Sequence, residues 1–241
     1  MAIAYNSAGQ DAYSGASVSS QNFTITVPSH TDGVLFVQVS PFDDQTATAA
    51  TYNGVSMTAP AAAANSGGTS YSARGFYLLN PATGANTLAV TLSGNTTDIS
   101  IIWAVYDNVS AISSGSNGTD PGSKVTTMSL DVTTTQSGEW GVFLNFAPGG
   151  GVAISTNLNA LPYSVSARYV ADSNASLGAA STYSLVMTQS NEWWYGGTAF
   201  SLQPTATTNI KTFDSVTYAN TKTVPVQEVA IASVKTFNGV A

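Results

Sequence analysis

The chain has 241 residues, enough for one large β domain with an appendage or for two small domains. Hydrophobic residues make up 43% of it and charged residues only 8%, which excludes a disordered chain rich in charge and poor in apolar residues. Six basic residues and a net charge of −7 argue against nucleic-acid binding, which needs clustered lysines and arginines. Cysteine is absent, so disulfides, thiolate metal sites and a cysteine nucleophile are excluded.

The N-terminal segment, residues 1–20, has neither the basic start nor the apolar centre of a secretory signal. We therefore expect synthesis in the cytoplasm without secretion. No stretch approaches the roughly 20 apolar residues of a membrane span, so no membrane partner is expected.

Short apolar segments dominate the chain that follows, and no long stretch has helical spacing. The segment FTITV, residues 23–27, alternates three apolar side chains with two threonines. GVLFVQVS, residues 33–40, is apolar on both faces, as a central strand of a sandwich is. Both patterns predict β-strands.

A hairpin is predicted in TYNGVSMT, residues 51–58, where Asn53 and Gly54 supply the positive φ angles of a type I′ turn. A second turn, rich in Pro and Gly, is predicted at residues 80–86. Further strands of the first half are predicted at residues 73–79, 87–93 and 98–106.

The second half begins with a polar stretch, residues 110–123, which we interpret as a long surface loop. Alternation then resumes at residues 125–132 and at residues 139–147, where Trp140 begins one apolar face. Further strands are predicted at residues 164–170, 181–188 and 193–202. About a dozen short strands separated by turns predict an all-β protein, a jelly-roll or related antiparallel β-sandwich, over residues 1–204.

The composition changes after Pro204, and residues 205–241 are predicted to form a linker and an extended, β-rich C-terminal tail. Three similar phrases fill this tail: NIKTFDSVTYA, NTKTVPVQEVA and SVKTFNGVA, each with a Lys-Thr pair. A strand formed by VKTFNGV has no cleanly apolar face, and its backbone needs hydrogen-bond partners. Addition to the edge of a neighbouring sheet supplies them. We predict an assembly arm; the alternatives are a tail that completes its own sandwich and one that stays disordered. The arm residues expected to make contacts are Ile210, Lys211, Phe213, Val216, Lys222, Val234, Lys235, Phe237 and Val240.

The chain has one histidine, His30, which together with Asp32 and a serine is a conceivable catalytic triad. Serines are so abundant that their presence carries no information. The sequence around His30 is turn-like, and we favour a structural turn histidine.

Two glutamates next to tryptophans, Glu139 and Glu192, form the best enzymatic pair in the sequence. Glycoside hydrolysis needs two carboxylates roughly 5 to 10 Å apart, with aromatic side chains to hold the sugar. Both glutamates stand where a turn enters a strand, a common place for a single carboxylate. We therefore predict no catalytic residues and no enzyme activity.

The aromatic cluster Trp193, Trp194 and Tyr195 is a candidate contact for a glycan or a subunit. Adjacent side chains of a strand point to opposite faces, so one tryptophan is expected in the core and the other at the surface. Ordinary packing of both is the alternative.

Two oxygen-rich loops are candidate calcium sites: one holds Asp43 and Asp44, the other Asn117 and Asp120. Neither has the dense spacing of acidic side chains found in calcium-binding loops. Ordinary turn chemistry explains both, so no metal and no cofactor are predicted.

Four segments together resemble a family of β-sandwich proteins found in bacteriophage virions and in phage-like genes of environmental bacteria. They are TYNGVSMT, GFYLLNPATGANTLAVTLSG, ISIIWAVYDNVS and NEWWYGGTAFSLQP, and the resemblance covers residues 1–204. Its most specific element is NPATGANTLAV, residues 80–90. The C-terminal KTFNGVA is similar to the closing segments of phage structural proteins. The resemblance implies a place in a particle and no catalytic chemistry.

These observations predict a structural protein on the surface of a phage-like virion, a capsid decoration or fibre subunit anchored by its arm. Its expected partners are further copies of itself and another virion protein. The alternative is a carbohydrate-binding module or adhesin that binds a cell-surface glycan through its tryptophans. A homo-oligomer is expected, because a small sandwich with an arm gains from symmetric exchange.

Overall fold

The computed structural model describes residues 1–42, 44–64, 72–119, 125–147, 151–155, 157–165, 167–193 and 196–206, without the side chains of residues 192 and 193. The described residues form fourteen β-strands and no α-helix, and all strand pairs are antiparallel. They include no helix long and apolar enough to cross a membrane. The predicted all-β antiparallel sandwich is confirmed, while residues 207–241 of the predicted tail lie outside the described residues.

The strands, in chain order, are β1 (Ala4–Val27), β2 (Val34–Pro41), β3 (Ala47–Tyr52), β4 (Val55–Ser56), β5 (Arg74–Leu79), β6 (Gly84–Asp107), β7 (Val109–Thr119), β8 (Val125–Thr133), β9 (Trp140–Phe146), β10 (Val152–Ile154), β11 (Ala160–Val165), β12 (Arg168–Asp172), β13 (Thr182–Trp193) and β14 (Gly196–Pro204).

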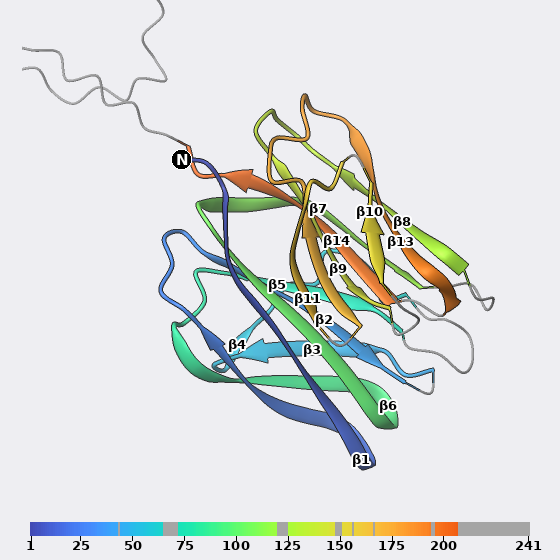
Figure 1. Cartoon of the computed structure of the whole chain (residues 1–241). Helices are drawn as coiled ribbons and strands as arrows, with labels where there is room; N and C mark the ends of the chain where they lie inside the picture. The colour runs from blue at the N-terminus through green and yellow to red at the C-terminus, as the bar shows by residue number, and fades with distance from the viewer. Residues whose placement is uncertain are drawn as a thin grey trace, which may run out of the picture. The chain divides into compact units, whose positions relative to one another are not determined.

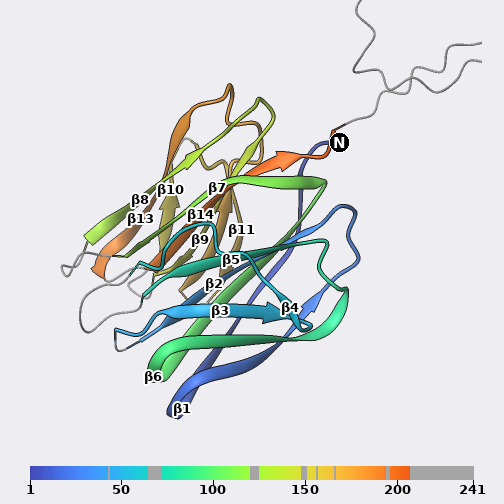
Figure 2. The same cartoon turned by 180° about the vertical axis from the view of Figure 1, so that it is seen from behind.

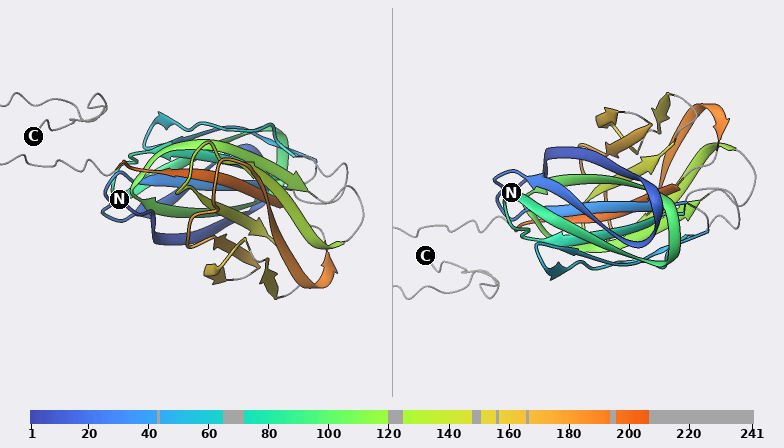
Figure 3. Two further views of the ribbon diagram at one scale, coloured as in Figure 1. Left: turned by 90° about the horizontal axis from the view of Figure 1, so that it is seen from above. Right: turned by 90° about the horizontal axis from the view of Figure 1, so that it is seen from below.

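A long, bent ribbon of β1 and β6 organises the first half of the chain (Figure 1). The two strands have 24 residues each and pair along their whole length, from Ala4 opposite Asp107 to Val27 opposite Gly84. The first half of β6 also pairs with β3, and its second half pairs with β2. One continuous sheet therefore supplies two facing layers, and the views in Figure 3 show the two strands curving together.

This first sheet nearly closes into a barrel. Its two remaining borders, β4 and β5, meet through a bridge in which Thr58 and Tyr77 exchange backbone hydrogen bonds of 2.9 and 2.8 Å. The first core fills the interior, with Phe23, Leu88 and Ile101 among its buried side chains. The third border strand of this sheet is β1, which pairs only with β6 among the described strands.

The strand β2 is buried on both faces over all eight residues, as the apolar run at residues 33–40 predicted. Leu35 and Val37 face the first core, whereas Val34 and Phe36 face a second core. This second core separates the barrel from a five-stranded sheet in the order β11-β12-β9-β14-β7. The Phe36 and Phe200 rings meet there with their centroids 4.4 Å apart.

A three-stranded sheet, β10-β13-β8, covers the far side of the five-stranded sheet and encloses a third core, which contains Phe143 and Met187. The protein up to Thr205 is thus a stack of four β layers with three cores between them. Figure 2 shows this stack from behind, with the strands of the first half below those of the second.

Several local predictions are confirmed. The hairpin β3–β4 turns through Asn53 and Gly54, with φ angles of 49° and 75°. The inward side chains of residues 87–93 are buried. So are three of the four apolar side chains on the predicted face of residues 139–147, and Trp140, the fourth, packs half-buried against the second core.

The predicted loop at residues 110–123 is wrong, because β7 runs from Val109 to Thr119 and pairs with β14. Its sequence lacks alternation because glycines serve for close packing. A Cβ at Gly115 would lie 2.4 Å from Pro60 Cγ, and one at Gly118 would lie 2.6 Å from Leu130 Cδ2.

Two further strand boundaries differ from the prediction. The single strand expected at residues 164–170 is a hairpin, β11–β12, whose turn places Ala167 at a φ of 64°. An alanine gives no sequence signal for this conformation, which glycine and asparagine normally supply. The first nineteen residues of β1, 4–22, were not predicted as a strand at all.

Candidate functional site

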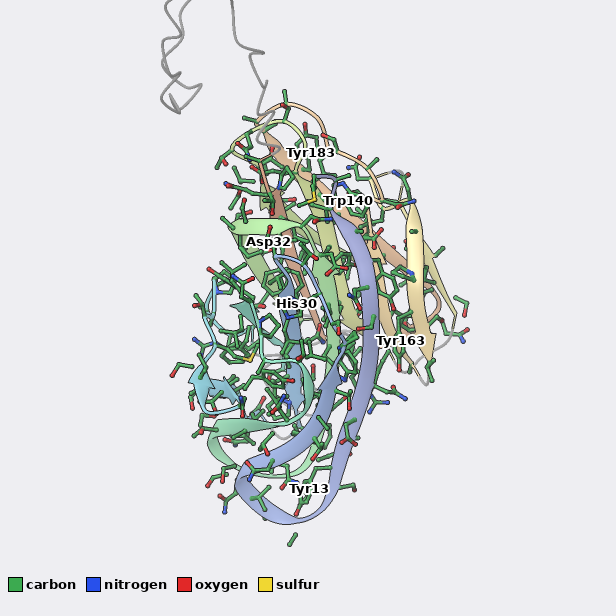
Figure 4. All side chains as sticks on the ribbon, turned by 90° about the vertical axis from the view of Figure 1, so that its left-hand side faces the viewer. Tyr13, His30, Asp32, Trp140, Tyr163 and Tyr183 are labelled. Carbon is green, nitrogen blue, oxygen red and sulfur yellow. The ribbon has the colours of Figure 1, made fainter. Side chains whose placement is uncertain are left out.

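The single histidine is not arranged as a catalytic base. His30 lies between β1 and β2, and its Nε2 donates to the carbonyl oxygen of Pro81 at 2.8 Å. Its ring lies over Gly33, where a Cβ would come within 2.5 Å of Nδ1, and no described residue hydrogen-bonds Nδ1. A triad needs Nε2 to accept the serine proton and Nδ1 to donate to a carboxylate. Figure 4 labels His30 and Asp32 on this side of the molecule.

Glu139 is fully buried and organises the turn that precedes β9. Its Oε1 accepts from the Thr135 N–H at 2.8 Å, the Thr135 hydroxyl at 2.9 Å and the Gln136 N–H at 3.0 Å. Its Oε2 accepts from the Ser201 hydroxyl at 2.6 Å. Burial alone would raise the pKa of this carboxyl, but the hydrogen bonds outweigh it and hold the pKa below its usual value. This carboxylate is a structural cap.

The two glutamates belong to different sheets: Glu139 stands just before β9 of the five-stranded sheet, whereas residue 192 lies in β13 of the three-stranded sheet. Glu139 precedes Trp140, which pairs with Leu202, whereas the other end of β9, Phe146, pairs with Gly196. Residue 192 lies shortly before Gly196, so β9 separates the two positions by about 20 Å. A glycosidase pair spans about 5 to 10 Å, so this pair is not suited to glycoside hydrolysis.

The described residues of the two candidate calcium loops have structural roles. Asn117 joins two layers: its side-chain oxygen accepts from Gly75 N–H at 2.8 Å, and its amide donates to Ala62 O at 2.7 Å. Asp44 stands in the turn after β2 with a φ of 59°. Asp43 and Asp120 lie outside the described residues. Within the described ranges, no three acidic or histidine side chains gather where they would hold a metal ion.

The aromatic and tail candidates fall outside the described part of the chain. The strand β13 ends at Trp193, whose side chain is not described, and β14 begins at Gly196. Trp194, Tyr195 and all nine arm residues lie outside the described residues. Two shallow hollows on the described body are lined by small, polar and aliphatic side chains, such as Thr127, Met128 and Gln189, and by no aromatic ring.

The most prominent feature of the described surface is an unpaired strand edge along β1. Over its 24 residues, β1 hydrogen-bonds only to β6 among the described strands, so the backbone groups of its other side have no strand partner within the described residues. Figure 4 shows β1 on the face toward the viewer, with Tyr13 near its bend and Tyr163 of β11 beside it.

The other described borders are protected in ways that natural sheets commonly use. The strands β4 and β10 have only two and three residues, and β11 contains Pro162. The edge of β8 is covered by hydroxyls from β7, because Ser116 donates to Asp131 O at 2.8 Å and Ser114 accepts from Thr133 N–H at 2.7 Å. In contrast, β1 contains no proline, no lysine and a single charge, Asp11.

A buried tyrosine–aspartate pair joins the barrel to the five-stranded sheet. The Tyr106 hydroxyl of β6 donates to Asp172 Oδ2 of β12 at 2.7 Å, and both side chains are buried. Burial raises the pKa of Asp172, and the Tyr106 hydrogen bond offsets part of that rise. The Tyr5 ring packs edge-on against Tyr106 with centroids 5.7 Å apart. Neither partner was singled out from the sequence, because the pair is 66 residues apart and forms no local motif.

No protein-family model matches the chain, and no curated protein matches it either.

Proposed function

We propose that the protein is a structural subunit of a phage-like virion, exposed on the particle as a capsid decoration or fibre subunit and anchored by its C-terminal arm, residues 210–240. The observation that carries the proposal is the unpaired edge of β1. A long, exposed strand edge with one charge is an aggregation liability unless a partner strand covers it. An assembly subunit meets this condition.

Two further observations support the proposal. The segments at residues 75–94 and 191–204 resemble those of phage virion proteins. The outer face of the β13–β8 pair is hydroxyl-rich: Thr127 pairs with Thr188 at 3.2 Å, and Thr133 with Thr182 at 3.1 Å. Such a surface is hydrated without needing charge and suits a protein that persists outside the cell.

The test compares the oligomeric state of the full chain with that of a chain ending after Ala206, by size-exclusion chromatography with light scattering. Ending at Ala206 keeps the Thr205 carbonyl, to which the Met1 ammonium donates at 2.6 Å. We expect the full chain to assemble and the shortened chain to be a folded monomer, with circular dichroism as the check on folding. Assembly that survives truncation would contradict an anchoring arm.

The competing function is carbohydrate binding through residues 193–195. A glycan array probed with the full chain addresses it directly. A monomeric full chain that binds a glycan, and loses that binding in Trp194→Ala but not in Trp140→Ala, would replace the structural proposal with a binding module.

A further inference from the structure

The edge of β1 contains an uninterrupted run at Ser7–Ser14. These eight residues pair with β6 from Val105 to Asp98 without a register shift, whereas shifts occur on either side of the run. A β-bulge bends the strand and breaks the ladder, so an added strand follows only a regular run. The tail phrases IKTFDSV and VKTFNGV have seven residues each, one fewer than this run, so either fits within it.

The backbone of this run has a donor directed away from β6. The Ala12 N–H donates to the side chain of its neighbour, Asp11 Oδ1, at 2.8 Å. In an antiparallel strand the direction of the backbone groups alternates, so Gln10 and Ser14 share the orientation of Ala12. An incoming strand therefore finds backbone donors and acceptors of β1 at every second residue. On docking, the Ala12 N–H would donate to a backbone carbonyl of the incoming strand in place of Asp11 Oδ1.

Charge selects this run over the other regular run of β1, Ser20–Val27. Asp11 is exposed and is the only charged residue of β1, while Ser20–Val27 has none. The tail carries three lysines against Asp214 and Glu228, a net charge of +1. Since the whole chain has a net charge of −7, the remaining residues have a net charge of −8. Each KTF phrase brings one lysine, and a lysine next to Asp11 frees the Ala12 N–H for the ladder.

The direction of the chain favours an arm from another copy. The described chain ends beside its own beginning, since the Met1 ammonium contacts Thr205 O at 2.6 Å. An arm that continued along its own β1 would start at the same end and run parallel to it. Parallel strands occur almost only where both faces of a sheet are covered, and within Ser7–Ser14 the side chains of Asp11, Ala12 and Ser14 are exposed.

We infer that the edge of β1 at Ser7–Ser14 is the docking site for a KTF phrase of the C-terminal arm of a second copy, which pairs antiparallel to β1. This inference rests on the arm of the proposed function and adds the acceptor that the arm binds.

Disulfide trapping tests the inference, because the chain has no native cysteine. Two full-length versions are mixed: one carries Ala12→Cys, and the other carries a single cysteine at position 234, 236 or 238 in turn. We expect a disulfide between the two versions for at least one arm position. Thr127→Cys, on an exposed strand face away from the edge, replaces Ala12→Cys as the control and should not cross-link. Equal trapping by the control overturns the inference.

Edge-blocking variants of the full chain provide the second measurement. Ala12→Pro removes a donor that β6 does not use, and Ala12→Ser is its matched control. We expect Ala12→Pro to weaken assembly at least about tenfold relative to Ala12→Ser, as Thr236→Pro in the arm also should. Ala12→Arg, which repels the arm's lysine, replaces Ala12→Pro if urea unfolding shows that the proline variant is not folded.

The outcomes separate the inference from the proposed function. If Thr236→Pro weakens assembly and the Ala12 variants do not, the arm binds elsewhere, and only the inference is overturned. A disulfide within one chain carrying both cysteines, without one between copies, makes the chain's own arm the occupant and also overturns it. A monomeric full chain with no trapping overturns both.

Discussion

Replacing Tyr106 by phenylalanine tests whether the buried pair with Asp172 holds the barrel to the five-stranded sheet. The change removes one hydroxyl and leaves the ring contacts with Tyr5 and Phe36, whose centroids lie 5.7 and 6.1 Å away. A hydrogen bond to a charged acceptor contributes about 1.5 to 3 kcal/mol, and its loss leaves a buried carboxylate short of a donor. We expect Tyr106→Phe to lower the free energy of unfolding by about 2 to 3 kcal/mol at pH 7.

The penalty should depend on pH in a defined direction. Burial raises the pKa of Asp172 above its usual 3.8, so its ionised form opposes folding at neutral pH, and the Tyr106 hydroxyl offsets part of this effect. Below the pKa the carboxyl is neutral, and the lost bond is one between neutral groups, which contributes about 1 kcal/mol. The destabilisation should therefore shrink as the pH falls from 7 toward 3.5.

Urea unfolding followed by tryptophan fluorescence across this pH range measures the effect. Tyr5→Phe removes a hydroxyl from the neighbouring ring and should change stability by less than about 0.5 kcal/mol. A double-mutant cycle with Asp172→Asn isolates the coupling between the two side chains. The reasoning is refuted if Tyr106→Phe has the same effect at both ends of the pH range, or if the cycle shows no coupling.

Two further predictions concern the cap at Glu139 and the packing between layers. Glu139→Gln should destabilise the protein by about 2 kcal/mol at pH 7. The pKa of Glu139 in the folded protein lies below its ordinary 4.5, so its carboxylate contributes fully to stability above that value. This contribution is lost as the pH falls through the folded pKa, so urea unfolding should give the variant and the parent similar free energies of unfolding in acid. A variant that stays equally destabilised in acid would contradict the capping role. Gly75→Ala should destabilise by about 1 to 3 kcal/mol, because its Cβ would lie 2.0 Å from Thr198 Oγ1, whereas Gly151→Ala, with nothing within 4 Å, should have almost no effect. If the two alanine variants lower the melting temperature equally, the packing around Gly75 adjusts to the added methyl group and the prediction is wrong.

Sequence patterns predicted the parts of the fold in which one face of a strand is buried or a turn needs a special residue. Asn53 and Gly54 identified the hairpin because few residues adopt positive φ angles. The apolar run of β2 identified a strand between two cores, since burial on both faces removes the need for polar alternation. These signals are local and follow directly from backbone geometry and burial.

The parts that escaped prediction depend on partners distant in sequence. The strand β7 is held by β14 and by glycines that admit Pro60 and Leu130, so its own residues resemble a loop. The first half of β1 is likewise a strand only because β6 pairs with it. The contact between Tyr106 and Asp172 joins two layers, and no periodicity within either segment anticipates it.

The pairing of β1 with β6 also has a consequence for synthesis. The last residue of β6 leaves the ribosome about 80 residues after the last residue of β1, an interval of about 4 to 16 s at ordinary elongation rates. Until β6 is complete, the N-terminal part of a nascent β1, which pairs with the last residues of β6, has neither edge covered. Its first nineteen residues, rich in serine, glycine and alanine, offer no continuous apolar run to a neighbouring nascent chain. The low apolar content of this segment lowers its tendency to pair with another nascent chain before β6 is complete.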